Sequence, residues 1–294
     1  MAVLNIVTHD GTFHTDDVFA CATLSLAFQG REIEIIRSRE QTRIDTADIV
    51  VDVGEIYDPA KNRFDHHQKG GAANRENGIP YASFGLVWKT YGAQVCGSEE
   101  IAQLIDERLV QCIDGPDNGV GEIYMGNGFY PYGVMDIISA ERPTWQESTD
   151  IDESFMTAVN MATHILRRVI AHTTAYTQAK VLLQQAYDAS PDKRIIEIGQ
   201  EYPGWLEFAA DHSDILYVIY KRQSDGWSVK AARVDPKTFE LRKSFPTTWG
   251  DMRAEAFQKL TGVPDAVFCH KGLFIAVAAS REGAWALAKS AVES

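Results

Sequence analysis

Strand-like and helix-like segments alternate from the start of the chain to about residue 112, and this alternation constrains the fold more than any other feature. The strand-like segments are apolar runs, and the helix-like ones carry apolar side chains three or four positions apart. The strands span residues 2–8, 32–38 and 47–53, and the helices span residues 16–29, 83–91 and 98–112. Strands that alternate with helices predict an α/β fold with a parallel sheet covered on both faces.

The rest of the chain divides into a helical stretch and a second, smaller α/β unit. Apolar residues between 150 and 189 recur at spacings of three and four, which predicts one long helix or a bent pair. The strand candidates that follow are 194–198, 214–220, 227–234 and 273–279, and the helix candidates are 251–262 and 281–293. We therefore expect a catalytic domain at 1–150, a helical connector at 151–190 and a substrate-binding domain at 191–294.

The 294 residues carry a formal net charge of −13, so the general basic footprint of a nucleic-acid-binding protein is absent. An acidic total still allows a phosphate-bearing substrate, because bound metal ions can supply positive charge locally. The four cysteines include no CxxC pair and suit reduced thiols, so we expect a cytoplasmic protein. We expect no signal peptide, because the N-terminus has no basic region followed by an apolar stretch. We expect no membrane contact, because the chain has no run of about 18 apolar residues.

Histidine and aspartate concentrate in four short segments, each placed where a strand or helix is expected to start or end. These segments are residues 8–17, 50–54, 63–67 and 113–119, the last expected as a loop just past a helix. Each has an ordinary alternative: Asp16 can begin a helix, and Asp114 and Asp117 can be turn residues. Since ligands bind at the carboxyl ends of parallel strands, we expect His9 and Asp52 to be neighbours there.

The residue types in these segments favour a particular kind of metal site. Imidazole and carboxylate ligands without cysteine suit Mn(II), with Mg(II) as the alternative, rather than a structural zinc ion. Two ions about 3.5–4 Å apart that share a carboxylate are the usual arrangement for hydrolysis of phosphate esters. The four segments together therefore predict a two-ion phosphoesterase.

The same segments resemble a known superfamily. His14-Thr15-Asp16, Asp52 and Asp65-His66-His67 resemble motifs of the DHH phosphoesterases. The chain is most similar to the melanocyte-proliferating-gene (Myg) type within that superfamily, and the likeness covers nearly its whole length. The stretches that carry it are THDGTFHTDD, VVDVGEIYDPAKNRFDHHQKGG, YASFGLVWKTYG, IDGPDNG, FPTTWG and VFCHKGLFIAVAASREGAWALA.

The resemblance implies a role for each matching residue in a DHH-type N-terminal domain. One ion takes His9, His14 and Asp52, and the other takes Asp16, Asp52, His66 and either Asp114 or Asp117. His67 lies beside the phosphate, and Asp65 is counted with it as catalytic. The implied activity is that of a hydrolytic nuclease, an exonuclease that removes nucleotides from the 3′ end of RNA or short oligonucleotides.

Four residues are candidates for substrate binding in a cleft expected between the domains. Arg63 and Lys69 form a basic rim near the third segment, while His270 and Lys271 lie in a turn of the second domain. Two rivals remain: a hydrolase of a small phosphate compound such as a dinucleotide or pyrophosphate, and a metal-stabilised binding protein without turnover. The sequence also leaves open a homodimer.

Overall fold

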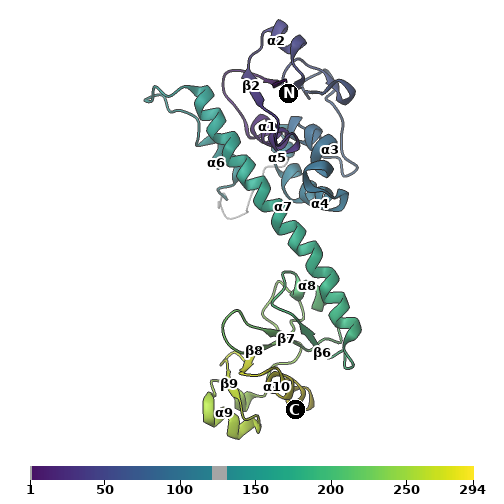
Figure 1. The fold of residues 1–294 in the computed structure, drawn as a ribbon, viewed down its shortest axis with the longest axis vertical. Helices are drawn as coiled ribbons and strands as arrows, with labels where there is room; N and C mark the ends of the chain where they lie inside the picture. Colours follow the sequence, from purple (N-terminus) through teal and green to yellow (C-terminus); the bar gives the residue numbers. More distant parts are fainter. Residues whose placement is uncertain (1, 121–130) are drawn as a thin grey trace. The chain divides into compact units, whose positions relative to one another are not determined.

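The computed structural model describes residues 2–120 and 131–294, which form two compact units, Met1–Thr173 and Thr174–Ser294. Helix α7 (Ile151–Ala189) runs without interruption from the first unit into the second, so the apolar stripe belongs to one helix rather than a bent pair (Figure 1). The boundary between the units falls inside this helix. The expected three-part division at 150 and 190 stays a prediction.

The first unit is built on a five-stranded sheet with the order β2-β1-β3-β5-β4. Its strands are β1 (Leu4–Thr8), β2 (Ile33–Arg37), β3 (Ile49–Val51), β4 (Tyr57–Asp58) and β5 (Arg63–Phe64). The first four strands in this order are parallel, and β4 pairs antiparallel with β5. The α/β fold expected from the sequence is confirmed, with a short antiparallel edge that the sequence pattern did not indicate.

Helices cover both faces of this sheet. Ile6, Ile49 and Val51 face a large core that includes α1 (Thr15–Ala27) and α3 (Ser83–Cys96). Val7 and Val50, the alternate positions, face a smaller core that includes α2 (Gln41–Thr46). This alternation of apolar residues on both faces explains why the strands read as continuous apolar runs.

A continuous helical region follows α3. It consists of α4 (Glu99–Ile105), a π-helical turn at Asp106–Val110 and α5 (Gln111–Asp117), and Figure 1 shows α5 beside α1 and α3. The fourth His/Asp segment was expected as a loop, and that expectation was wrong, because residues up to Asp117 are helical. Pro116 lacks the N–H that would bond to the carbonyl four residues earlier, and the helix ends one residue after it. The remaining elements of this unit are a 3-10 turn at Pro59–Lys61 and α6 (Val134–Ser139).

The second unit contains a sheet of order β6-β7-β8-β10-β9. Its strands are β6 (Ile195–Ile198), β7 (Tyr217–Lys221), β8 (Trp227–Ala231), β9 (Ala266–Cys269) and β10 (Ile275–Ala278). Its helices are α8 (Trp205–Asp211), a 3-10 turn at Thr247–Trp249, α9 (Ala254–Thr261) and α10 (Arg281–Glu293). Strand β9 and helix α8 were not expected, because both are short and carry little periodic signal.

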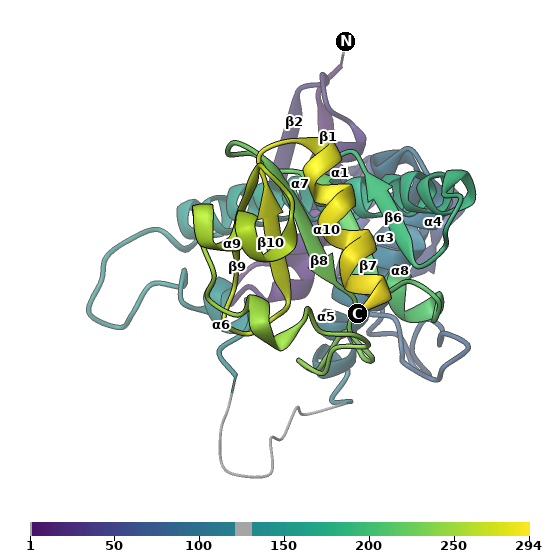
Figure 2. The same ribbon diagram turned by 90° about the horizontal axis from the view of Figure 1, so that it is seen from below.

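Both faces of the second sheet are also covered. Helices α9 and α10 pack against the face that carries Ile195 and Ile219, and Figure 2 shows α10 lying across the strands. Helix α8 and the end of α7 contribute to the core on the other face, which carries Ile196 and Val218. Among helices of the described residues, none has the length and apolar character needed to cross a membrane.

Candidate metal centre

The turn between β1 and α1 positions the first group of site residues. His9 directly follows β1 and is buried, and its Nδ1 lies 2.9 Å from the carbonyl oxygen of Asp10. Asp17 accepts hydrogen bonds from the main-chain N–H groups of His14 and Val18, each 2.8 Å long. These bonds satisfy N–H groups at the start of α1, as acids near a helix N-terminus often do. Local interactions therefore fix both the start of α1 and the direction in which its His and Asp residues point.

Asp52 follows β3 and adopts an unusual main-chain conformation. Its φ is +55°, and Gly54 two residues later has a φ of +93°. Aspartate enters this left-handed region more readily than most residues, yet the conformation still carries strain. The Asp52 N–H donates to the carbonyl of Phe64 over 3.1 Å, which continues the pairing of β3 with β5. The turn thus brings the Asp52 carboxylate to the carboxyl edge of the sheet.

The Asp65-His66-His67 segment follows β5 and faces Asp52. The two Asp65 oxygens hold His67 and the neighbouring turn: Oδ1 lies 2.8 Å from His67 Nδ1, and Oδ2 accepts from the Glu55 N–H at 2.6 Å. His66 is directed inward, with Nε2 3.4 Å from Asp52 Oδ1. His67 is directed outward, with 57% of its side chain exposed, although its Nδ1 is also 3.4 Å from Asp52 Oδ1.

Helix α5 settles which of its two acids faces the centre. Asp117 Oδ2 lies 3.3 Å from His66 Nε2, and Asn118 Oδ1 lies 3.3 Å from His66 Nδ1. Asp114 instead pairs with Arg75 over 2.8 Å and accepts from the Gly85 N–H over 3.0 Å. The geometry therefore groups Asp117, and not Asp114, with the other candidate ligands.

The start of α3 supports two of the acids directly. The main-chain N–H groups of Ser83 and Phe84 donate to the two oxygens of Asp16, over 3.1 Å and 2.7 Å. The Ser83 hydroxyl donates to Asp52 Oδ1 over 3.0 Å. Sequence reasoning did not identify Ser83. The only available signal was a serine at the start of a helix in the YASFG stretch.

Three groups of side chains in the described residues could each hold a cation. They are His9, His14 and Asp52; Asp16, His66 and Asp117; and Asp52, His66 and His67, each with ligand atoms within 4.8 Å of one another. Asp52 belongs to the first and the third of these groups, so it connects His9 and His14 with His66 and His67. His9, His14, Asp16, Asp52 and His66 thus converge as expected, together with Asp117, although their roles as ligands remain predictions.

The hydrogen bonding of these groups fits a bound cation. Within residues 2–120 and 131–294, Nε2 of His9, Nε2 of His66 and Oδ2 of Asp17 are buried and have no hydrogen-bond partner. His9 Nε2 and Asp17 Oδ2 lie 3.0 Å apart but lack the geometry of a hydrogen bond. Buried polar atoms are normally paired, so unpaired imidazole nitrogens that point at carboxylates suit metal coordination.

Burial and charge strongly shift the pKa values in this centre. Burial, reinforced by the carboxylates of Asp52 and Asp117, raises the pKa of Asp16 well above its usual range. Burial alone would raise the pKa of Asp52, but His66 and His9 outweigh it and lower that pKa. Burial alone would lower the pKa of His9, but Asp17 and Asp52 raise it to about 10. Carboxylates crowded together in a buried place favour a multiply charged cation.

A cavity of about 500 Å³ opens beside the centre, with His9, His14, Asp52 and His67 in its wall. Arg39 also lines this cavity and pairs with exposed Asp10 over 3.2 Å. Sequence reasoning did not single out this arginine, because it stands in an ordinary polar stretch. Among the arginines of the described residues, Arg39 is the one that lines this cavity.

The four predicted substrate residues lie elsewhere or have other contacts. The Arg63 guanidinium donates to the main-chain carbonyls of Lys61 and Ala47, over 2.9 Å and 3.1 Å, and so joins β5 to the chain before β3. Lys69 is exposed. His270 and Lys271 belong to the second unit and are exposed. Their binding of substrate stays a prediction.

A His/Asp centre of this kind, at the carboxyl edge of a parallel sheet and beside an open cavity, defines a metal-dependent hydrolase of the α/β class. The family model MYG1_exonuc, described as "Uncharacterised protein family (UPF0160)", matches residues 5–292. The chain belongs to this family.

Curated relatives match over almost the full chain. The human "MYG1 exonuclease" is 30% identical over 325 residues, which cover 99% of this chain and 86% of the relative. The "MYG1 protein" of Dictyostelium discoideum is 29% identical over 317 residues, covering 98% of this chain and 96% of the relative. Among solved structures, RecJ from Thermus thermophilus in complex with Mn2+ aligns at 12% identity and a TM-score of 0.28, over 99% of this chain and 52% of that chain.

Proposed function

We propose that this enzyme is a two-ion phosphodiesterase that removes nucleotides from the 3′ end of RNA or short oligonucleotides. The observation that carries the proposal is the position of Asp52, which is shared between two groups of candidate ligands. The mammalian relatives, which carry the name exonuclease, support the choice of a nucleic-acid substrate. Mn(II) or Mg(II) suits the imidazole and carboxylate donors.

When bound, the two ions would be held by His9, His14, Asp52, Asp16, His66 and Asp117, and they would supply positive charge and an activated water. The chain's own contribution to proton transfer is the His67–Asp65 pair. His67 Nδ1 lies 2.8 Å from Asp65 Oδ1, so Asp65 can accept a hydrogen bond from Nδ1–H, and this tautomer leaves Nε2 without a proton. His67 can therefore hold or pass on a proton at Nε2 beside a phosphate in the cavity.

A comparison of labelled substrates tests this proposal. The protein is incubated with Mn(II) and a short RNA labelled at its 5′ end or at its 3′ end, with pyrophosphate and a dinucleotide in parallel. We expect 5′-labelled RNA to give a ladder that shortens one nucleotide at a time, and 3′-labelled RNA to release a labelled mononucleotide first. A single internal cut, or the reverse pattern of labels, would contradict the proposed polarity.

One rival has an observation in its favour. The net charge of −13 disfavours long nucleic acids, which suits a hydrolase of a small compound such as a dinucleotide or pyrophosphate. In the same assay, faster turnover of pyrophosphate or a dinucleotide than of RNA would select this rival. Tight metal binding without turnover of any of these substrates would select a non-catalytic, metal-stabilised binding protein.

A further inference from the structure

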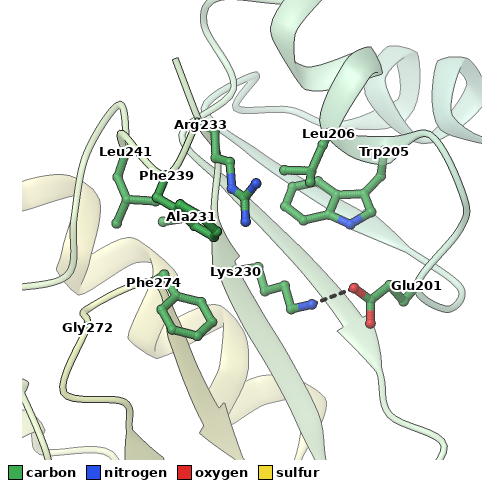
Figure 3. Close-up of a pocket in the computed structure, with 10 residues that line it drawn as sticks. All are labelled: Glu201, Trp205, Leu206, Lys230, Ala231, Arg233, Phe239, Leu241, Gly272 and Phe274. Carbon is green, nitrogen blue, oxygen red and sulfur yellow. Dashed lines mark hydrogen bonds and ion pairs between the residues drawn. The ribbon is translucent and has the colours of Figure 1, made fainter. Parts of the chain in front are cut away.

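The second unit contains a pocket of about 340 Å³ that none of the predicted metal ligands enters. Its wall combines aromatic, aliphatic and charged side chains, as Figure 3 shows. The residues come from the segment between β6 and α8, the start of α8, the end of β8, a hairpin after β8 and the turn before β10. They are Glu201, Trp205, Leu206, Lys230, Ala231, Arg233, Phe239, Leu241, Gly272 and Phe274. We refer to this as the C-terminal pocket. Its volume lies at the lower end of the range for small-molecule sites.

The mouth of the pocket presents an aromatic ring to solvent. Phe239 is 88% exposed, and Phe274 on the same side is 39% exposed. Phe239 lies in a hairpin that is closed by the bridge between Arg233 and Leu241 and by the bond from the Val234 N–H to the Glu240 carbonyl. Phe239 and Phe274 therefore expose adjoining apolar surface in the wall of one pocket, and apolar surface gathered at a pocket, unlike a single exposed ring, indicates contact with a ligand.

Two cations point into the same space. The Arg233 guanidinium lies 4.8 Å from the centre of the Phe239 ring, and in the described part of the chain it donates only to the Pro236 carbonyl, over 3.2 Å. Lys230 pairs with Glu201, which also accepts from the Tyr220 hydroxyl over 3.0 Å. Figure 3 shows Arg233 and Lys230 between the rings of Phe239 and Phe274 on one side and Trp205 on the other.

These features together specify the chemistry of a ligand. Exposed aromatic rings beside a guanidinium group bind planar aromatic rings by stacking. Two cations face one carboxylate, so the pocket is locally positive in a chain whose net charge is −13, and an anionic group on the ligand is favoured. A nucleotide has both features, a planar aromatic base and an anionic phosphate, and we infer that it is of a size to fit a pocket of about 340 Å³.

We propose that the C-terminal pocket binds one nucleotide, with the base stacked on Phe239 and the phosphate beside Arg233. This inference rests on the proposed function only for where the nucleotide comes from, which would be the oligonucleotide substrate. A pocket that binds a base favours an oligonucleotide over pyrophosphate as the substrate, because pyrophosphate has no base. Binding of the nucleotide itself requires no metal ion and no turnover.

The test measures binding by the full chain that carries Asp52→Asn, in the presence of EDTA, by titration calorimetry. The probes are AMP, adenosine and ribose 5-phosphate, which separate the contribution of the base from that of the phosphate. We expect AMP to bind more tightly than either fragment. Phe239→Ala should weaken AMP about tenfold, as expected for the loss of one stacked base, and should leave ribose 5-phosphate unchanged. Phe239→Trp should restore AMP binding.

Two further variants complete the comparison. Arg233→Gln should weaken AMP and ribose 5-phosphate but not adenosine. Leu260→Ala, which shortens another exposed apolar side chain of the same unit outside the pocket, should change none of the affinities. Equal affinities for AMP and ribose 5-phosphate, or an unchanged AMP affinity in Phe239→Ala, would overturn the proposal. Tighter binding of a phenylalanine-containing peptide than of AMP would overturn it in favour of a peptide ligand.

Failure of the proposed function gives a different result. If the wild-type chain with Mn(II) hydrolyses no RNA while Asp52→Asn still binds AMP through Phe239, the exonuclease assignment fails and the C-terminal pocket stands. If RNA is hydrolysed but AMP does not bind to this pocket, the inference fails and the proposed function stands.

Discussion

The Ser83 hydroxyl donates a hydrogen bond to Oδ1 of Asp52 over 3.0 Å, and both side chains are buried. Ser83 is the first residue of α3, whereas Asp52 follows β3, so the bond joins a helix start to a strand end at the metal centre. The same residue donates its main-chain N–H to Asp16. Ser83 therefore holds two candidate ligands from different elements in a fixed relation.

Ser83→Ala should weaken metal binding and turnover without unfolding the chain. Removal of a partner that orients a metal ligand typically costs about 10–100-fold in metal affinity or activity. The lost hydrogen bond should lower the free energy of unfolding by only about 1 kcal/mol, since the main-chain bonds to Asp16 remain. Mn(II) titration and urea unfolding measure the two effects. Ser25→Ala, which removes a hydroxyl bonded to the Cys21 carbonyl within α1, is the matched control; an equal loss of metal affinity there would rule out a specific role for Ser83.

Asp52→Asn should abolish hydrolysis and empty both ion positions. The amide keeps the size of the side chain but removes the charge that two cations would share. The variant should also be slightly less stable without metal at neutral pH. The Asp52 carboxylate has a lowered pKa beside His66 and His9, so its contribution to stability is present above its ordinary pKa and lost as pH falls. Metal content, turnover and melting temperature are measured on one preparation, and near wild-type turnover with full metal content would exclude Asp52 as the shared ligand.

Asp117→Asn should lower activity and Asp114→Asn should lower stability. Asp117 faces His66, so its variant should lose metal affinity and turnover while it unfolds at nearly the wild-type urea concentration. Asp114 is fully buried and accepts from Arg75 and the Gly85 N–H, so its variant weakens both bonds and should lose about 2 kcal/mol of stability, while Arg75 keeps its pair with Asp106. Urea unfolding and Mn(II) titration of both variants check this. A stable Asp114→Asn chain that no longer binds metal would show that the two roles are exchanged.

Metal binding should release protons and strengthen as pH rises. Asp17 and Asp52 outweigh the opposite effect of burial and raise the pKa of His9 to about 10, so the metal-free protein carries a proton there at neutral pH. A metal ion binds only the neutral imidazole and must displace this proton. The affinity for Mn(II) should therefore increase by roughly tenfold per pH unit for each proton released, up to the raised pKa. Calorimetry in two buffers of different ionisation enthalpy counts the protons, and a buffer-independent heat would refute the prediction.

Local patterns in the sequence were sufficient for the outline of the first unit and for most of its candidate ligands. Apolar runs predicted the strands that precede His9 and Asp52, because a strand buried on both faces must be apolar throughout. The rule that polar residues at the carboxyl ends of parallel strands meet at one edge then predicted that these two residues are neighbours. His9 Nε2 and Asp52 Oδ2 lie 3.4 Å apart.

The tertiary structure alone separated Asp117 from Asp114. Both acids lie in the same short helix, and helical spacing alone lets residues three apart share one face. What separates them is their partners, His66 for Asp117 and Arg75 for Asp114, and these come from distant parts of the chain. No local pattern encodes such a choice, because it depends on which long-range ion pair forms when the helix packs.

The same reason explains the residues that sequence reasoning missed or placed differently. Ser83 and Arg39 acquire their positions beside the centre only when α3 and the chain after β2 pack next to the strand ends. The Arg63 guanidinium donates to main-chain carbonyls, one of them 16 residues earlier in the chain, and no local pattern indicates that contact. The sequence by itself determined the kind of chemistry, through the identity and order of the histidines and aspartates. Tertiary packing decided which side chains face the candidate metal centre and which hold those side chains in place, because those contacts join residues far apart in the chain.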